Sequence, residues 1–215
     1  MTHLAILIVY WLRHITSSLS CLQAFYASVH HAFPAYLNAL HILYRDYSLE
    51  PLRTYPPASA ANLAAAEAAL GFALDPALKA TWQSANGSDE WQTVFARPGY
   101  ITGYSFLSLA DSLREREYMA HRAPQYDGYE QEQPRDPRIC SGWYQAGWLP
   151  FAAFSAPDLL LIADHSPTAS GQCGQIIAFS HDPDTISYVC TDFATLLEQS
   201  LATIREHPED CLPEE

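Results

Sequence analysis

The 215-residue sequence predicts an α+β fold with a central, mostly antiparallel sheet and helices packed around it. Segments with helical spacing come first, four short apolar segments with strand character follow one another between residues 147 and 190, and one helical segment closes the chain. Hydrophobic residues make up 49% of the chain and charged residues 16%. This composition provides enough apolar side chain for a sizeable core and argues against a disordered chain.

Residues 1–50 are predicted to be an N-terminal helical extension. Leu4–Leu12 is an unbroken apolar run, shorter than the roughly 20 residues that a membrane-spanning helix needs. Export or membrane attachment stays open as an alternative to a soluble chain, although no Lys or Arg precedes the run as in a typical signal peptide. Residues 22–50 carry apolar side chains at helical spacing, with a kink or break expected at Pro34.

A domain over residues 51–207 is predicted to begin with two short helices. Ser59 is a favourable N-cap for the alanine-rich segment that ends at Gly71, where left-handed backbone is expected. Asp75 is suited to cap a second helix, which Asn86-Gly87 ends.

A third helix is predicted from Ser108 to the neighbourhood of Pro124, and a mobile, exposed loop over residues 124–138 follows it. Four strands are then expected, within residues 147–151, 158–162, 174–179 and 186–190. A closing helix runs from about Asp192 to Pro208, and residues 208–215 read as a frayed acidic tail.

The charge of the chain limits its partners. It has 24 acidic and 11 basic side chains, with a formal net charge of −13. Phosphate groups would be repelled, so nucleic acid and anionic membranes are not expected as partners, whereas a basic protein is. The five cysteines fit neither a disulfide framework nor a zinc site, which favours reduced thiols and a cytoplasmic protein.

No catalytic, cofactor-binding or metal-binding residues are predicted. The segment around Ser105 lacks the second glycine of a nucleophile elbow. A metal site is conceivable if the acids and histidines near the strand ends gather at one end of the sheet, but turn chemistry explains most of them. These residues are Asp158, Asp164, His165, His181, Asp182 and Asp184. An uncharacterised enzyme or metal protein therefore stays the second alternative.

Six residues are candidates for contact with a protein partner. Trp91, Trp143 and Tyr144 flank loops that contain glycine or charge, and each is either an aromatic anchor or a core residue. Asp89 and Glu90 form an acidic-aromatic group with Trp91, and Asp158 precedes an apolar strand.

An ordered set of short segments between residues 55 and 205 resembles the SMI1/KNR4 family of the SUKH superfamily. The segment Gly147-Trp148-Leu149-Pro150-Phe151 is the most characteristic of them. The others are Pro56-Pro57-Ala58-Ser59, Ala66-Glu67, Leu70-Gly71, Leu74 to Asn86-Gly87, Phe106-Leu107-Ser108-Leu109, Asp158, Gly174-Gln175-Ile176-Ile177, His181-Asp182 and the helix from Phe193 to Leu201.

This resemblance implies a mixed α+β domain without a shared catalytic motif. Bacterial members are commonly immunity proteins against polymorphic or contact-dependent toxins, and fungal relatives regulate the cell wall through protein contacts. The expected function is thus a protein-binding module that neutralises a basic toxin domain, a nuclease being one possibility. A regulatory or scaffold protein without a toxin partner is the alternative, and the oligomeric state is left open.

Overall fold

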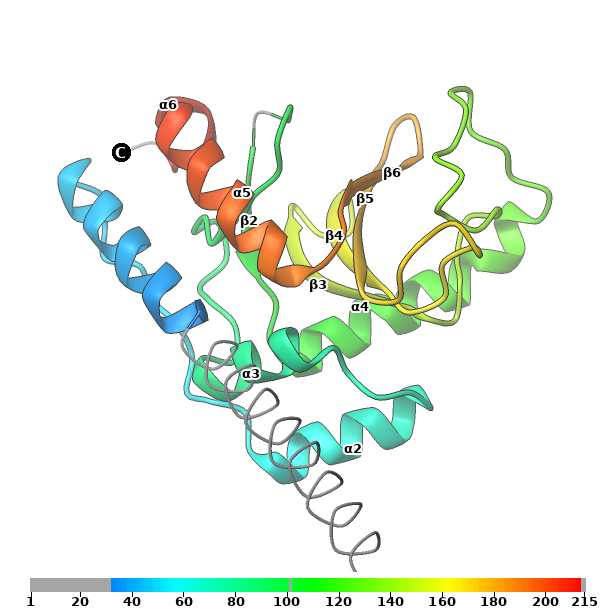
Figure 1. Cartoon of the computed structure of the whole chain (residues 1–215), viewed down its shortest axis with the longest axis horizontal. Helices are drawn as coiled ribbons and strands as arrows, with labels where there is room; N and C mark the ends of the chain where they lie inside the picture. Colours follow the sequence, from blue (N-terminus) through cyan, green and yellow to red (C-terminus); the bar gives the residue numbers. More distant parts are fainter. Residues whose placement is uncertain (1–31, 101, 214–215) are drawn as a thin grey trace, which may run out of the picture.

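The computed structural model describes residues 32–100 and 102–213, which form a six-stranded antiparallel sheet surrounded by helices (Figure 1). The strands follow one another across this curled sheet in chain order, so the predicted α+β class is confirmed. They are β1 (Phe95–Ala96), β2 (Gly103–Phe106), β3 (Trp148–Phe154), β4 (Leu159–Asp164), β5 (Gln175–Ser180) and β6 (Thr185–Cys190). The helices are α2 (Ala60–Leu70), α3 (Pro76–Ser84), α4 (Leu109–Arg122), η1 (Ala123–Tyr126, a 3₁₀ helix), α5 (Phe193–Glu206), α6 (Pro208–Cys211) and a helix over residues 32–46.

The predicted caps are present at the starts of the helices. The side chain of Ser59 accepts a hydrogen bond from the backbone N–H of Asn62, and α2 ends at Gly71 with a φ of 78°. The Asp75 carboxylate accepts from the first turn of α3, and Ser108 and Asp192 cap α4 and α5 in the same way. These local signals explain why the helix positions were predictable from the sequence.

Both faces of the sheet are buried, because alternate residues along β3, β4 and β5 belong to two separate apolar clusters. The first core packs under α2, α3, α5 and the helix over residues 32–46, and it includes Leu149 and Phe151 of β3. The second core includes Trp148 of the same strand, together with Ile162 and Ile177 from its neighbours. A sheet of this kind needs a cover on each side.

The cover of the second face is the segment that the sequence predicted to be a mobile loop. Tyr126 and Tyr129 pack against the second core, and the hydroxyl of Tyr129 donates to the backbone carbonyl of Asp184. Gln131 accepts a hydrogen bond from the backbone N–H of Ile186 at 3.1 Å. Most of residues 124–138 are exposed and form a loop, as predicted, but the prediction that this loop is mobile was wrong, because its aromatic side chains pack on the sheet and keep water from it.

The helix over residues 32–46 belongs to the first core. Phe33, Leu40 and Tyr44 are almost fully buried there. The Tyr36 hydroxyl lies 2.7 Å from Ser200 Oγ on α5 and donates to the carbonyl of Val94, which joins this helix to the closing helix and the start of the sheet. The other expectations for residues 1–31 lie outside the described residues.

The end of the chain also packs on the core. A helix, α6, begins at Pro208, and its last residue, Cys211, and the following Leu212 are buried. The frayed tail that the sequence predicted is thus a packed element as far as Leu212. Two apolar side chains after a proline and two acids provide the reason, since their burial outweighs the disorder typical of a chain end.

We expect the Leu40→Ala variant to be destabilised by about 2–5 kcal/mol, because Leu40 is fully buried and its loss leaves a cavity. Ile42→Ala on the same helix is the matched control, since Ile42 is 40% exposed. We expect a change of under about 1 kcal/mol there. Urea unfolding followed by circular dichroism measures both. Equal effects of the two substitutions would show that this helix is not part of the cooperative core.

Candidate functional site

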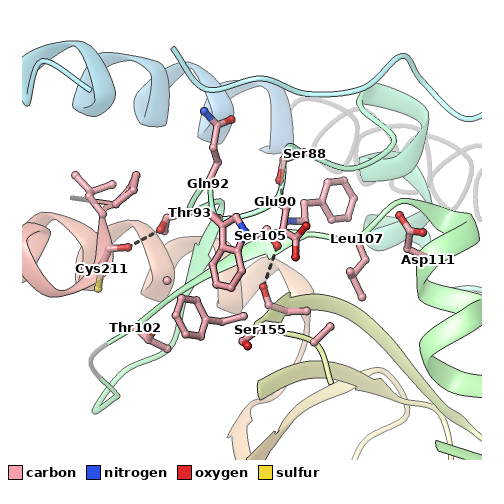
Figure 2. Close-up of a pocket in the computed structure, with 18 of the residues that line it drawn as sticks. Ser88, Glu90, Gln92, Thr93, Thr102, Ser105, Leu107, Asp111, Ser155 and Cys211 are labelled. Carbon is pink, nitrogen blue, oxygen red and sulfur yellow. Dashed lines mark hydrogen bonds between the residues drawn. The ribbon is translucent and has the colours of Figure 1, made fainter. Parts of the chain in front are cut away.

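A pocket of about 440 Å³ lies where the turn before β1, strand β2, the β3–β4 turn, the start of α4 and α6 meet (Figure 2). Figure 2 shows Thr93 and Cys211 at one side of this pocket and Asp111 at the other. The volume falls within the range of about 300–1,000 Å³ that ligand pockets occupy. We call this hollow the acidic pocket, because its charged lining consists of five carboxylates and one arginine: Glu90, Asp111, Glu115, Glu209, Asp210 and Arg114.

The turn that carries Trp91 is held from both sides. Gln92 accepts a hydrogen bond from the backbone N–H of Arg53 at 2.7 Å and donates to the carbonyl of Pro51 at 3.1 Å. The backbone N–H of Asp89 donates to the carbonyl of Arg53 at 3.1 Å. These bonds fix the turn, and Trp91 with it, on the extended segment before α2.

Trp91 forms an exposed aromatic wall with Phe154 from the end of β3. The two rings meet edge to face, with centroids 5.6 Å apart, and 57% of Trp91 is exposed. Trp91 has a φ of 67°, and Ser155 beside Phe154 has a φ of 47°. Left-handed backbone at residues other than glycine costs about 1–3 kcal/mol and is concentrated at functional sites.

The electrostatics of the acidic pocket are dominated by uncompensated carboxylates. Arg114 is the one basic residue of the lining, and its guanidinium already lies 2.6 Å from Asp111 Oδ1. Glu90 and Glu115 have no hydrogen-bond or ion-pair partner among the described residues. Burial, with a smaller contribution from Asp111, raises the pKa of Glu115 above its ordinary value. The pocket thus attracts cations and repels anions.

Close backbone packing fixes α6 against the sheet side of the acidic pocket. The Thr93 hydroxyl donates to the carbonyl of Cys211. A side chain at Gly103 would collide with both of these groups, so only glycine permits the approach. Glu209 and Asp210 are carried to the rim by this contact.

Of the six predicted partner-binding residues, Glu90 and Trp91 line the acidic pocket. Asp89 stands beside it, with its carboxylate 3.9 Å from Arg53. The backbone carbonyl of Asp89 accepts from the Ser88 hydroxyl at 3.2 Å. The proposed acidic-aromatic group is therefore a contiguous feature of the surface.

Trp143 and Tyr144 lie elsewhere, in the second core. Only 4% of Trp143 is exposed, and its ring stacks on Tyr126 with centroids 4.3 Å apart. Its indole N–H donates to Asp184 Oδ2 at 2.6 Å. Tyr144 is half-buried against the same cluster. Trp143 therefore packs as a core residue, the alternative that the sequence left open.

Asp158 is exposed at the edge of a second, smaller pocket of about 250 Å³, between the β3–β4 turn and the end of α4. Its role in partner binding stays a prediction.

The residues considered as a metal site lie at both ends of β4. Asp158 precedes this strand and Asp164 ends it, roughly 20 Å apart at about 3.3 Å per residue. Asp158, His181, Asp182 and Asp184 lie close together at one end of the sheet, whereas Asp164 and His165 lie at the other, so the six residues do not form one site. Among the described residues, a set with ligand atoms close enough for a metal is His207, Glu209 and Asp210, all exposed.

A family model described as SMI1 / KNR4 family (SUKH-1) matches residues 57–199, which is more than half of the chain. The chain belongs to the SMI1/KNR4 family. The resemblance based on the ordered segments is therefore confirmed. No curated protein matches the chain in a sequence search. Within the described part of this SMI1/KNR4 protein, no helix has both the length and the apolar character required to cross a bilayer.

The matched region contains most of the acidic pocket of this SMI1/KNR4 protein, including Trp91, Phe154 and Glu115. The α6 wall and the helix over residues 32–46 lie outside it. Sequence reasoning missed Phe154, Glu115 and Glu209 because they join Trp91 only through the tertiary fold. A weak signal was present for α6, since Pro208 followed by two acids is typical of a helix start.

Near the second pocket, His181 Nδ1 lies 2.6 Å from Asp184 Oδ1, and this contact raises the pKa of His181 above its ordinary 6.5. Because the pKa of His181 is higher in the folded chain than in the unfolded chain, protonated His181 stabilises the fold. This stabilisation is complete below pH 6.5 and is lost as the pH rises through the pKa of His181 in the folded chain. We expect the Tm of the wild type to lie above that of His181→Gln, and we expect this difference in Tm to be larger at about pH 5.5 than at about pH 8.5. The exposed His121→Gln is the control, and a pH-independent difference for His181→Gln would contradict the assigned ion pair.

Proposed function

We propose that this chain is a non-catalytic, cytoplasmic protein-binding module that neutralises a basic toxin domain by covering its functional surface. The acidic pocket with the exposed Trp91 is the observation on which the proposal depends. Membership of the SMI1/KNR4 family supports it, because many bacterial members are immunity proteins.

The charge of the whole chain supports the same kind of partner. A protein with a formal net charge of −13 attracts a basic surface over long distances, and such steering raises association rates above the ~10⁵–10⁶ M⁻¹s⁻¹ of neutral partners. Nuclease toxins have basic substrate grooves, so we propose a nuclease as one suitable partner. Long-range attraction is screened by salt, which gives the proposal a simple kinetic signature.

The experiment that tests this function pairs the chain with the product of a toxin gene adjacent to its own. We expect tight binding, loss of toxin activity in the complex, and an association rate that falls as salt increases. If no toxin is encoded nearby, and the chain instead co-purifies with an unrelated cellular protein, the regulatory or scaffold alternative replaces the toxin partner.

In that complex we expect Trp91→Ala to weaken binding by about 2 kcal/mol or more, which is roughly 30-fold in Kd. A rigid, half-exposed tryptophan at the edge of a pocket is typical of an interface anchor. Tyr47→Ala removes an aromatic side chain of similar exposure outside the pocket lining and serves as the control. Isothermal titration calorimetry measures both variants. An unchanged Kd for Trp91→Ala would exclude the acidic pocket from the interface.

A further inference from the structure

We infer that the acidic pocket receives the guanidinium group of an arginine side chain from the protein partner. The inference rests on the proposed function for the existence of that partner, but the chemistry of the pocket can be tested separately. It goes beyond a general attraction between acidic and basic surfaces, because it assigns one functional group to one cavity.

Three hydroxyl groups of the pocket, those of Ser88, Thr93 and Ser105, are arranged to accept hydrogen bonds. Ser105 Oγ donates its hydrogen to the carbonyl of Ala153 at 2.9 Å, and Ser88 Oγ donates to the carbonyl of Asp89 at 3.2 Å. Thr93 donates to the carbonyl of Cys211. Because each hydrogen is already committed, the remaining capacity of these oxygens is for acceptance. Ser88 Oγ already accepts from the backbone N–H of Phe106 at 3.0 Å, which leaves it one lone pair, whereas no donor to Ser105 Oγ or Thr93 Oγ1 is present among the described residues. A ligand rich in N–H donors matches this lining.

The five carboxylates of the pocket share one cation, Arg114, which is paired with Asp111 and also weakly favours the charged form of Glu115. Glu90 and the half-buried Glu115 have no ion-pair partner among the described residues. A partly buried carboxylate without a partner is unfavourable, and burial raises the pKa of Glu115 for this reason. A cation brought by the partner would supply the missing charge.

The aromatic wall favours a guanidinium over an ammonium. Trp91 and Phe154 both line the pocket, and a planar guanidinium can stack on an indole face while its five N–H groups point to oxygen acceptors. A lysine ammonium is strongly hydrated and offers three donors without a plane to stack. The combination of aromatic surface, carboxylates and committed hydroxyls therefore selects arginine.

The test uses the full chain and three peptides that differ at one residue: acetyl-Gly-Arg-Gly-amide, its lysine analogue and its citrulline analogue. Citrulline keeps the planar shape of arginine but has no charge. The ¹⁵N–¹H indole resonance of Trp91, assigned with Trp91→Phe, reports binding at the pocket. We expect saturable shifts with the arginine peptide at a Kd on the order of 1 mM, at least about fivefold weaker binding of lysine, and no saturation with citrulline.

Substitutions then locate the ligand. Glu115→Gln and Glu90→Gln are each expected to weaken arginine-peptide binding by up to about fivefold, the upper end of the range for one partly exposed charge interaction. Glu117→Gln is the matched control, because Glu117 is exposed on the same helix and does not line the pocket. It should leave the Kd unchanged.

The inference is overturned if the arginine peptide gives no saturable shift at about ten times the expected Kd, if lysine or citrulline binds as well as arginine, or if Glu115→Gln behaves like Glu117→Gln. These results are separate from the toxin experiment. Toxin binding without arginine binding would refute the arginine assignment alone, and arginine binding without any toxin partner would refute the proposed function alone.

Discussion

The burial of both faces of one curled antiparallel sheet determines most of this structure. Strands β3, β4 and β5 contribute alternate side chains to two cores, so neither face can be left to solvent. Four helices cover one face, and the segment between α4 and β3 has to fold back over the other. The acidic pocket lies at the edge of the sheet, where β3 ends at Phe154 and α6 packs against the β1–β2 hairpin.

The same packing explains why the pocket is rigid. Its walls come from segments that are far apart in the chain. Hydrogen bonds between side chains and the backbone join them: the Gln92 side chain bonds to the segment before α2, and the Thr93 hydroxyl bonds to the end of α6. A preformed site loses little side-chain or loop entropy when it binds. The left-handed backbone at Trp91 and Ser155 can persist only because the surrounding contacts hold it.

The sequence predicted those parts of the fold that depend on local signals. Caps and turn residues located α2, α3, α4 and α5, and runs of apolar β-formers located β3 to β6. It did not reveal β1 and β2, which are too short for periodicity, or the packing of α6 and residues 124–138, which depends on contacts distant in sequence. The same limit applied to the candidate site. Asp89, Glu90 and Trp91 are adjacent in the sequence and could be predicted as a group, whereas Phe154 and Glu115 join them only through the tertiary fold. Trp143 shows the limit most clearly, since only the fold distinguishes an exposed anchor from a core residue.

The charge and the pocket act on different parts of a binding reaction. The net charge of −13 is spread over the chain, so it would govern the approach of the proposed basic partner, and no single carboxylate would dominate that effect. The acidic pocket acts at contact distance, where desolvation makes each aromatic or charged group matter individually. Salt should therefore change mainly the association rate, and substitutions in the pocket mainly the dissociation rate. An interface built on charge alone would lack the second dependence. Under the proposed function, the aromatic wall of Trp91 and Phe154, rather than the acidity of the chain, would therefore distinguish one basic partner from another.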